Sequence, residues 1–218
     1  MGRLAIVVPV RSLAGGKTRL DPDASPEMRQ ALTVRMLRHV LQAAITGGGS
    51  CDVLLVSPDP AALEIAREFD GIVTQVLQQS ERPGLNPAID LGRETAVAVG
   101  ADRMLVLFAD LPLLRAEDVQ AILAEESPVV LAPDRAGRGT NALLTHLDGN
   151  AASFRFAFGA GSAAAHRTEA ARLGLDVATV RTRGTTFDLD TPDNLCELLA
   201  EESPGAWGLS RESLECLR

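Results

Sequence analysis

Cysteine and histidine are scarce in this chain of 218 residues, which contains three of each. Cys51, Cys196 and Cys216 stand far apart, and their number is odd. A disulfide framework needs paired cysteines and a zinc site needs closely spaced ligands, so the pattern argues against both. It is typical of reduced thiols in a cytosolic protein, and we expect the protein to be cytoplasmic.

Long hydrophobic runs and broad positive charge are also missing. The first apolar run, residues 4–10, is too short to cross a bilayer and contains Pro9, so it fits a buried strand better than a signal peptide. The 21 Lys and Arg residues are outnumbered by 29 Asp and Glu residues, which gives a formal net charge of −8. Nucleic acids and anionic membranes bind broad basic surfaces. We therefore expect neither a nucleic acid nor a membrane as a partner.

Two common nucleotide-binding motifs are absent from the loop after this first run. A Walker A loop requires the spacing G-x-x-x-x-G-K-[ST], but Gly15 and Gly16 are neighbours and no glycine stands five residues before Gly16. The loop also lacks the dinucleotide fingerprint G-x-G-x-x-G. A P-loop NTPase and a dinucleotide-binding dehydrogenase therefore lose their usual sequence support.

The chain does contain an alternation of short apolar runs with longer helical patterns. This alternation predicts an α/β fold, a three-layer sandwich in which helices pack on both faces of a mostly parallel mixed sheet. With 46% apolar residues, the chain is long enough for one such domain, which we place at residues 1–202. Residues 203–218 break the rhythm, and we expect them to form an appendage, a dimer contact or a partly disordered tail.

The same patterns set element boundaries. Ser25 is expected to cap a helix that ends in three glycines, while Asn86-Pro87 and Thr191-Pro192 are typical N-cap and first-turn pairs. The expected strands are residues 4–10, 52–57, 72–77, 103–108, 128–133, 140–145 and 176–181. The expected helices are residues 26–46, 60–69, 87–99, 115–125, 162–173 and 191–201.

The loop after the first predicted strand combines three cations with two adjacent glycines. Glycines lack Cβ and let backbone N–H groups approach an anion, while lysine adds a mobile charge and arginine a forked donor. This combination predicts a triphosphate cradle, and the alternative is a solvated turn with ordinary surface charges. The residues are Arg11, Gly15, Gly16, Lys17 and Arg19.

Three aspartates are candidates for a cation site. A buried strand delivers Asp110 to its carboxyl end, where ligands bind in open α/β sheets, and a carboxylate there suits Mg²⁺. Alternation places Asp188 and Asp190 on the same face of an extended segment, and two converging negative charges call for a cation. The alternatives are that Asp110 caps the helix near Arg115 and that Asp190 is only a turn residue.

Six segments together resemble a known enzyme family. They are residues 11–20, 85–89, 109–114, 134–143, 156–166 and 188–192. In this order they resemble the nucleotide-diphospho-sugar transferase superfamily, and more closely the 2-phospho-L-lactate or phosphoenolpyruvate guanylyltransferase family of deazaflavin-coenzyme (F-420) biosynthesis. The resemblance covers about residues 4–199. It implies the Rossmann-like fold of that superfamily.

The resemblance also implies a reaction. GMP would pass from GTP to the phosphate of a small phosphorylated carboxylic acid, phosphoenolpyruvate or 2-phospho-L-lactate, with release of pyrophosphate. A phosphate dianion is already a nucleophile, so catalysis rests on alignment and charge neutralisation, and the scarcity of histidine fits. By the family pattern, Asp110, Asp188 and Asp190 would hold Mg²⁺, and Arg11, Lys17 and Arg19 would stabilise the triphosphate.

The family pattern assigns the phosphoacid to Thr140, Gly159 and Ser162, and the guanine or ribose to Asn86. A local account would make Ser162 and Asn86 helix N-caps and the glycine a turn residue. His166, one helical turn beyond Ser162, either faces the same anion or is simply exposed or packed.

Several alternatives remain open on the sequence. A molybdenum-cofactor guanylyltransferase or a sugar-phosphate cytidylyltransferase would share Lys17 and Asp110, and a non-catalytic nucleotide-binding protein would share Arg11 and Lys17. The acceptor is phosphoenolpyruvate, 2-phospho-L-lactate or 3-phosphoglycerate. A homodimer is possible, since the apolar positions of residues 28–45 suit either the core or a subunit interface.

Overall fold

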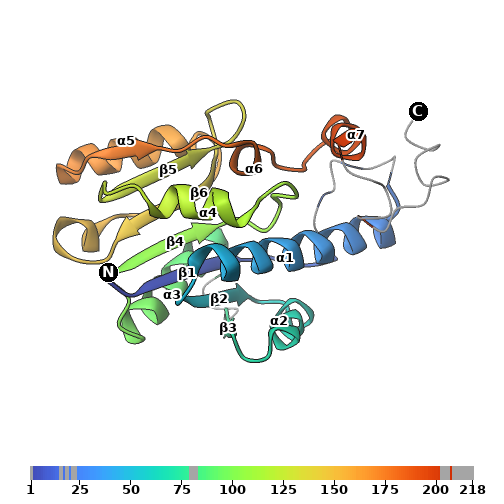
Figure 1. Ribbon diagram of the computed structural model, residues 1–218, viewed down its shortest axis with the longest axis horizontal. Coiled ribbons are helices and arrows are strands. Elements are labelled where there is room, and N and C mark those ends of the chain that lie inside the picture. The colour runs from blue at the N-terminus through green and yellow to red at the C-terminus, as the bar shows by residue number, and fades with distance from the viewer. Residues whose placement is uncertain are drawn as a thin grey trace.

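The protein is an α/β domain built around one sheet (Figure 1). A computed structural model describes residues 2–14, 17, 20, 24–78, 83–201 and 207. In this part of the chain the strands are β1 Leu4–Pro9, β2 Asp52–Ser57, β3 Val73–Leu77, β4 Arg103–Leu107, β5 Val129–Pro133, β6 Thr140–His146 and β7 Val177–Thr179. The helices are α1 Pro26–Gly48, α2 Pro60–Ala66, η2 Arg67–Phe69, α3 Leu85–Ala98, α4 Ala116–Leu123, η3 Gly149–Ser153, α5 Ser162–Leu173, α6 Arg183–Thr186 and α7 Pro192–Glu201.

The seven described strands form a mixed, mostly parallel sheet in the order β3-β2-β1-β4-β6-β5-β7. Strand β6 runs antiparallel to both of its neighbours, β4 and β5, and the other pairs are parallel. Because β6 runs in the opposite direction, its first residues lie beside the carboxyl end of β4. Residues far apart in sequence therefore meet at one edge of the sheet.

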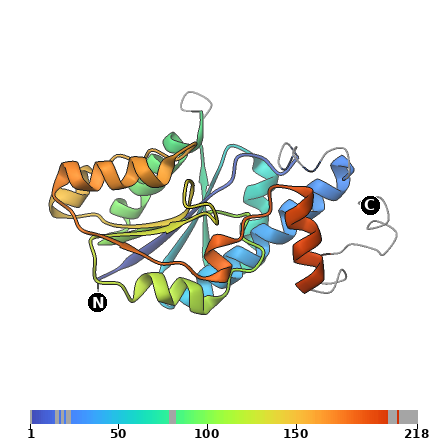
Figure 2. The same ribbon diagram turned by 90° about the horizontal axis from the view of Figure 1, so that it is seen from above.

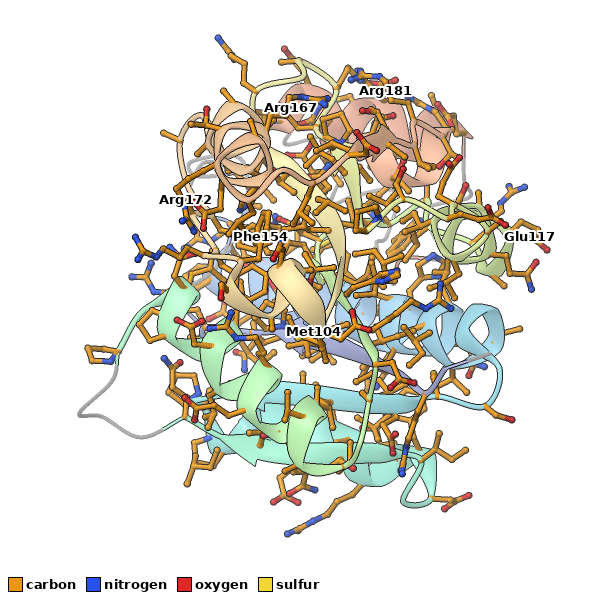
Figure 3. All side chains as sticks on the ribbon, turned by 90° about the vertical axis from the view of Figure 1, so that its left-hand side faces the viewer. Met104, Glu117, Phe154, Arg167, Arg172 and Arg181 are labelled. Carbon is orange, nitrogen blue, oxygen red and sulfur yellow. The ribbon has the colours of Figure 1, made fainter. Side chains whose placement is uncertain are left out.

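Both faces of the sheet are covered by helices, as Figures 1 and 2 show. Side chains of a strand alternate between the two faces, so Ile6 and Val8 of β1 pack with α1, α2 and α4, whereas Ala5 and Val7 pack with α3 and α5. In Figure 3, Met104 lies within this interior, while Arg172 projects outward from α5. The predicted three-layer α/β architecture is confirmed.

A third cluster of buried side chains lies beyond the sheet, between the first half of α1 and helix α7. Figures 1 and 2 show α7 beside that end of α1. Phe187 and Leu189, which flank Asp188, belong to this cluster, and so does Trp207. Trp207 is only 6% exposed, and its ring meets that of His39 edge-on at 5.7 Å. This tryptophan from the predicted tail therefore packs into the domain, and the tail's other residues lie outside the described part.

The predicted helix caps have mixed outcomes. Ser25 is the N-cap of α1, because its Oγ accepts the N–H of Met28 at 3.2 Å, and Thr191 Oγ1 accepts the N–H of Asn194 at 3.3 Å in the first turn of α7. The prediction for Asn86 is wrong, since α3 already begins at Leu85 after Gly84. Ser162 is likewise the first residue of α5, with Gly161 as its N-cap.

Most element boundaries agree with the sequence to within about two residues, but two short elements were missed. They are α6, Arg183–Thr186, and the 3₁₀ turn η3, Gly149–Ser153. Neither is long enough to show a hydrophobic period. Among the described helices, none has the length and apolar content needed to cross a membrane.

The buried indole of Trp207 generates a stability prediction. Trp207→Ala is expected to lower the free energy of unfolding by about 3–5 kcal/mol, because it leaves a cavity in the third cluster, and Trp207→Phe to lower it less. Urea denaturation followed by circular dichroism measures both. Ile72→Ala is the control, since Ile72 is 53% exposed, and a change of about 0.5 kcal/mol or less is expected there. An equally small effect of Trp207→Ala would contradict the packing described.

Candidate active site

A cavity of about 590 Å³ opens where the carboxyl end of β4 meets the start of β6. The backbone N–H of Phe108, just after β4, donates to the carbonyl of Asn141 at 3.1 Å, which joins the two strands at this point. The walls come from five parts of the chain, and they include six predicted site residues. These are Asp110, Thr140, Gly159, Ser162, Asp188 and Asp190.

Lys17 joins two of the three aspartates. Its Nζ donates to Asp110 Oδ2 and to Asp190 Oδ1, each at 2.8 Å, and its side chain is only 8% exposed. Burial lowers the pKa of Lys17, but the charges of Asp110 and Asp190 and their hydrogen bonds outweigh it, so the pKa stands above its ordinary value. Lys17 is therefore a fixed positive charge between the two carboxylates.

The carboxylates are left with an excess of negative charge. Burial, and then the nearby charge of Asp110, raise the pKa of Asp188 above its ordinary value, although Lys17 opposes the shift. Asp110 Oδ1 is buried and has no hydrogen-bond partner within the described residues. Those residues contain no group of three or more His, Cys, Asp or Glu side chains arranged to hold a metal ion. Lys17 forms ion pairs with Asp110 and Asp190, and Asp188 is the third carboxylate that lines the cavity.

The alternation predicted for the last pair of aspartates explains their direction. Phe187 and Leu189 are buried in the third cluster, whereas Asp188 and Asp190 line the cavity. The N–H of Leu189 also donates to the backbone carbonyl of Asp110 at 3.1 Å, which ties this segment to the loop after β4. Local pattern and long-range contact thus place three carboxylates around one space.

Cation–π contacts and ion pairs around Phe187, which the sequence analysis did not predict, hold the segment that carries Asp188 and Asp190. The guanidinium carbons of Arg135 and Arg183 lie 5.1 and 4.7 Å from the centre of the Phe187 ring. Both arginines bond to Glu197 of α7, and Arg183 also bonds to Glu201. Hydrogen bonds from Arg135 and Arg183 lower the pKa of Glu197 to about 2. The charged pairs thus join α6 and α7 to the segment that carries the carboxylates.

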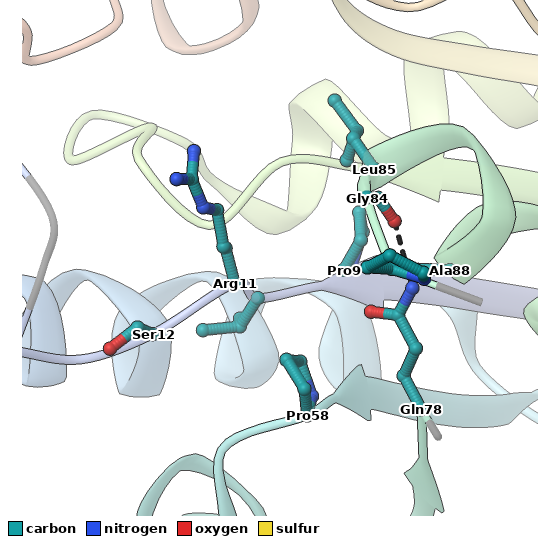
Figure 4. A pocket seen from close by; sticks show the side chains of 10 residues that line it. Pro9, Arg11, Ser12, Pro58, Gln78, Gly84, Leu85 and Ala88 are labelled. Carbon is teal, nitrogen blue, oxygen red and sulfur yellow. Dashed lines mark hydrogen bonds between the residues drawn. The ribbon is translucent and has the colours of Figure 1, made fainter. Parts of the chain in front are cut away.

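The residues of the first loop are distributed over two places. Lys17 bonds to Asp110, which lines the large cavity, while Arg11 lines a second cavity of about 350 Å³ beside the end of β1 (Figure 4). Gly15, Gly16 and Arg19 lie outside the described residues. Of the residues of the predicted triphosphate cradle, the structure describes Arg11 and Lys17, and the cradle itself stays a prediction.

The second cavity has a largely apolar lining with one buried amide. Pro9, Pro58 and Leu85 line it, together with Gln78, whose Nε2 donates to the carbonyl of Gly84 at 2.8 Å (Figure 4). Gln78 was missed by the sequence because a single polar residue at the end of a strand carries no motif.

Asn86 has a structural partner in the described chain. Its Nδ2 donates to the carbonyl of Phe158 at 3.0 Å, and its Oδ1 accepts the N–H of Phe158 at 2.8 Å. Asn86 thus clamps the loop before Gly159 onto α3. A contact between Asn86 and a nucleotide stays a prediction.

His166 is buried behind the part of the large cavity that Thr140 and Ser162 line. It is 1% exposed, its Nδ1 lies 3.1 Å from Thr140 Oγ1, and its Nε2 accepts the N–H of Ala157 at 3.1 Å. Ser162 Oγ also donates to Thr140 Oγ1 at 3.1 Å. Of the two positions expected for His166, the packed one is found.

Comparison with the sequences of known proteins identifies relatives of this chain. A relative from Rubrobacter xylanophilus, named phosphoenolpyruvate guanylyltransferase, is 43% identical over 197 residues, which cover 89% of this chain and 92% of the relative. A protein of the same name from Sphaerobacter thermophilus is 40% identical over 202 residues, which cover 92% of this chain and 94% of that one.

Solved structures agree on the fold. A crystal structure described as a nucleotide-diphospho-sugar transferase, from Desulfovibrio desulfuricans G20, is 20% identical with a TM-score of 0.73 and covers 100% of this chain and 98% of that one. A nucleotidyl transferase from Methanothermobacter is 15% identical with a TM-score of 0.65, over 91% and 97% of the two chains. The family model for CofC-like guanylyl transferases matches residues 4–214. This chain, with its lysine held between two cavity-lining aspartates, belongs to the CofC-like guanylyl transferase family.

Proposed function

We propose that this protein transfers GMP from GTP to the phosphate of phosphoenolpyruvate or a closely related three-carbon phosphoacid. An oxygen of the acceptor phosphate attacks the α-phosphorus of GTP, the bond from that phosphorus to the bridging oxygen of the β-phosphate breaks, and pyrophosphate leaves. The observation that carries the proposal is the meeting of Lys17, Asp110 and Asp190 at the cavity that Thr140 and Ser162 also line. The names of the curated relatives support the choice of phosphoenolpyruvate.

The site contains the groups that this reaction needs. A phosphate dianion needs no deprotonating base, so the barrier is lowered by alignment and by positive charge next to the phosphates. Lys17 supplies a buried positive charge, and the first loop adds Arg11 and, by its sequence, Arg19. In this proposal Gly15 and Gly16 let the loop backbone approach the triphosphate.

The carboxylates fit a magnesium site chemically. Asp110 Oδ1 is a buried oxygen without a partner in the described chain, and Asp188 and Asp190 line the same cavity. Asp110, Asp188 and Asp190 would hold Mg²⁺, which when bound neutralises charge on phosphate oxygens. Lys17 pairs with Asp110 and Asp190, and in this proposal its Nζ exchanges them for triphosphate oxygens when the nucleotide binds.

The smaller cavity supports a position for the base. Apolar side chains along its walls suit the faces of a purine ring. Arg11 lines the same cavity, which would put its guanidinium next to the phosphates that follow the nucleoside. We also propose a cytoplasmic location, which the free thiols of Cys51 and Cys196 support.

The direct test is a panel of substrates. GTP, ATP, CTP and UTP are each incubated with Mg²⁺ and phosphoenolpyruvate, 2-phospho-L-lactate or 3-phosphoglycerate, and the products are identified by mass spectrometry. Pyrophosphate and a guanylylated three-carbon acid are the expected products. Parallel reactions contain a sugar phosphate or a molybdenum cofactor precursor as the acceptor. A product from one of these, with none from the three acids, would contradict the proposal and favour another nucleotidyltransferase activity of the superfamily.

Asp110→Asn is expected to reduce kcat/KM for pyrophosphate release by about a thousandfold, because it removes the carboxylate charge that would hold Mg²⁺ and that pairs with Lys17. The thermal midpoint should change little. Asp148→Asn is the matched control, since the Asp148 side chain is 81% exposed and lies away from the cavity lining. Activity of Asp110→Asn within a few fold of the wild type would remove Asp110 from the mechanism.

Lys17→Met separates two effects of the lysine charge. Turnover with GTP is expected to fall by about a hundredfold or more, because a buried cation next to the phosphates is lost. Without nucleotide, the same variant should bind Mn²⁺ about tenfold more tightly, since Lys17 no longer compensates Asp110 and Asp190. Isothermal titration with Mn²⁺ measures this second effect. Unchanged or weaker Mn²⁺ binding would show that the carboxylates are not a cation site.

A further inference from the structure

His166 lies close to the acceptor end of the cavity without lining it. It stands on α5 one turn after Ser162, is 1% exposed, and its ring meets that of Phe158 edge-on at 4.6 Å. Any influence of His166 on a ligand must therefore pass through a residue that does line the cavity. Thr140 is such a residue, and His166 touches it directly.

The hydrogen bonds of His166 define its tautomer. The backbone N–H of Ala157 can only donate, so Nε2 of His166, 3.1 Å away, is an acceptor and carries no proton. Burial lowers the pKa of His166 to about 4, so the ring is neutral near pH 7. The single ring proton is then on Nδ1, and Nδ1 donates to Thr140 Oγ1 at 3.1 Å.

Two donors therefore converge on the hydroxyl oxygen of Thr140. Ser162 Oγ donates to it at 3.1 Å from one side, and His166 Nδ1 donates from the other. A hydroxyl oxygen has two lone pairs and one hydrogen, and both lone pairs are now engaged. In the described chain Thr140 Oγ1 has no further recorded hydrogen bond, and the residue lines the cavity. Its own hydrogen is the group left for a ligand in the cavity.

We infer that His166 is a positioning residue that fixes the Thr140 hydroxyl as a hydrogen-bond donor toward an anionic oxygen of the acceptor. This inference rests on the proposed function, because the acceptor is the phosphoacid of that reaction. If the Thr140 hydroxyl could rotate freely, its hydrogen would point toward Ser162 or the His166 ring in some rotamers. Binding of the acceptor would then have to select the rotamer that points into the cavity, at a cost in affinity. With His166 in place the donor is already set, and it favours carboxylate or phosphate oxygens over ligand donors.

A matched pair of variants separates the two hydrogen bonds of His166. His166→Gln places an amide near Nε2 and keeps an acceptor for Ala157 without the donor to Thr140, whereas His166→Asn places a donor near Nδ1. Initial rates are measured with GTP and phosphoenolpyruvate, and the thermal midpoint monitors the fold. His166→Gln should raise KM for phosphoenolpyruvate about fivefold to tenfold while KM for GTP stays within twofold. His166→Asn should recover KM for phosphoenolpyruvate to within about twofold of the wild type.

The same comparison in a Thr140→Val background isolates the path through the hydroxyl. With no hydroxyl to orient, His166→Gln should change KM for phosphoenolpyruvate by less than about twofold, which is the non-additivity of directly coupled residues. An equal effect of His166→Gln in both backgrounds would overturn the inference. So would equal losses in the Gln and Asn variants, since they would mark His166 as a packing residue.

The tautomer has a readout that does not depend on activity. In protein labelled with ¹⁵N-histidine, the spectrum at pH 7 should show the proton of His166 on Nδ1, and a proton on Nε2 would overturn the inference directly. Failure of the proposed function looks different, because the wild type itself would then transfer no nucleotide to any of the three phosphoacids. If the wild type is active and the His166 variants have unchanged KM for phosphoenolpyruvate, the inference is overturned and the proposed function stands.

Discussion

The ion pair that joins Lys17 to Asp110 and Asp190 is the constraint on which the site depends. It connects the first loop, the loop after β4 and the segment before α7, which are far apart in sequence. Because the lysine is nearly buried, its attraction to the two carboxylates is screened less than at the surface. The same pair places a positive charge near Asp188, which lines the cavity together with Asp110 and Asp190.

The fold makes this meeting possible through the reversed direction of β6. Parallel strands deliver their carboxyl ends to one edge, and an antiparallel neighbour delivers its first residues to the same edge. Asp110, which follows the end of β4, and Thr140, which begins β6, therefore line the same cavity. The third cluster then supports the site, because Leu189, between Asp188 and Asp190 in sequence, is buried in that cluster. In residues 187–190, burial of Phe187 and Leu189 on one side directs the carboxylates of Asp188 and Asp190 to the cavity on the other.

Much of this arrangement could be predicted from the sequence, because it depends on local patterns. The apolar runs located the strands, strand ends located Asp110, and period-two alternation gave the shared direction of Asp188 and Asp190. Features that depend on tertiary contact could not be predicted in this way. The roles of Asn86 and His166 are set by backbone groups of Phe158 and Ala157, which leave no trace in side-chain identity.

A crystal structure with Mn²⁺ and a non-hydrolysable GTP analogue tests the central claim most directly, since manganese is located by its anomalous scattering. We expect Mn²⁺ among Asp110, Asp188 and Asp190, and Lys17 Nζ at the triphosphate instead of between the carboxylates. A complex in which Lys17 still bridges Asp110 and Asp190, with nucleotide and metal bound elsewhere, would contradict the account.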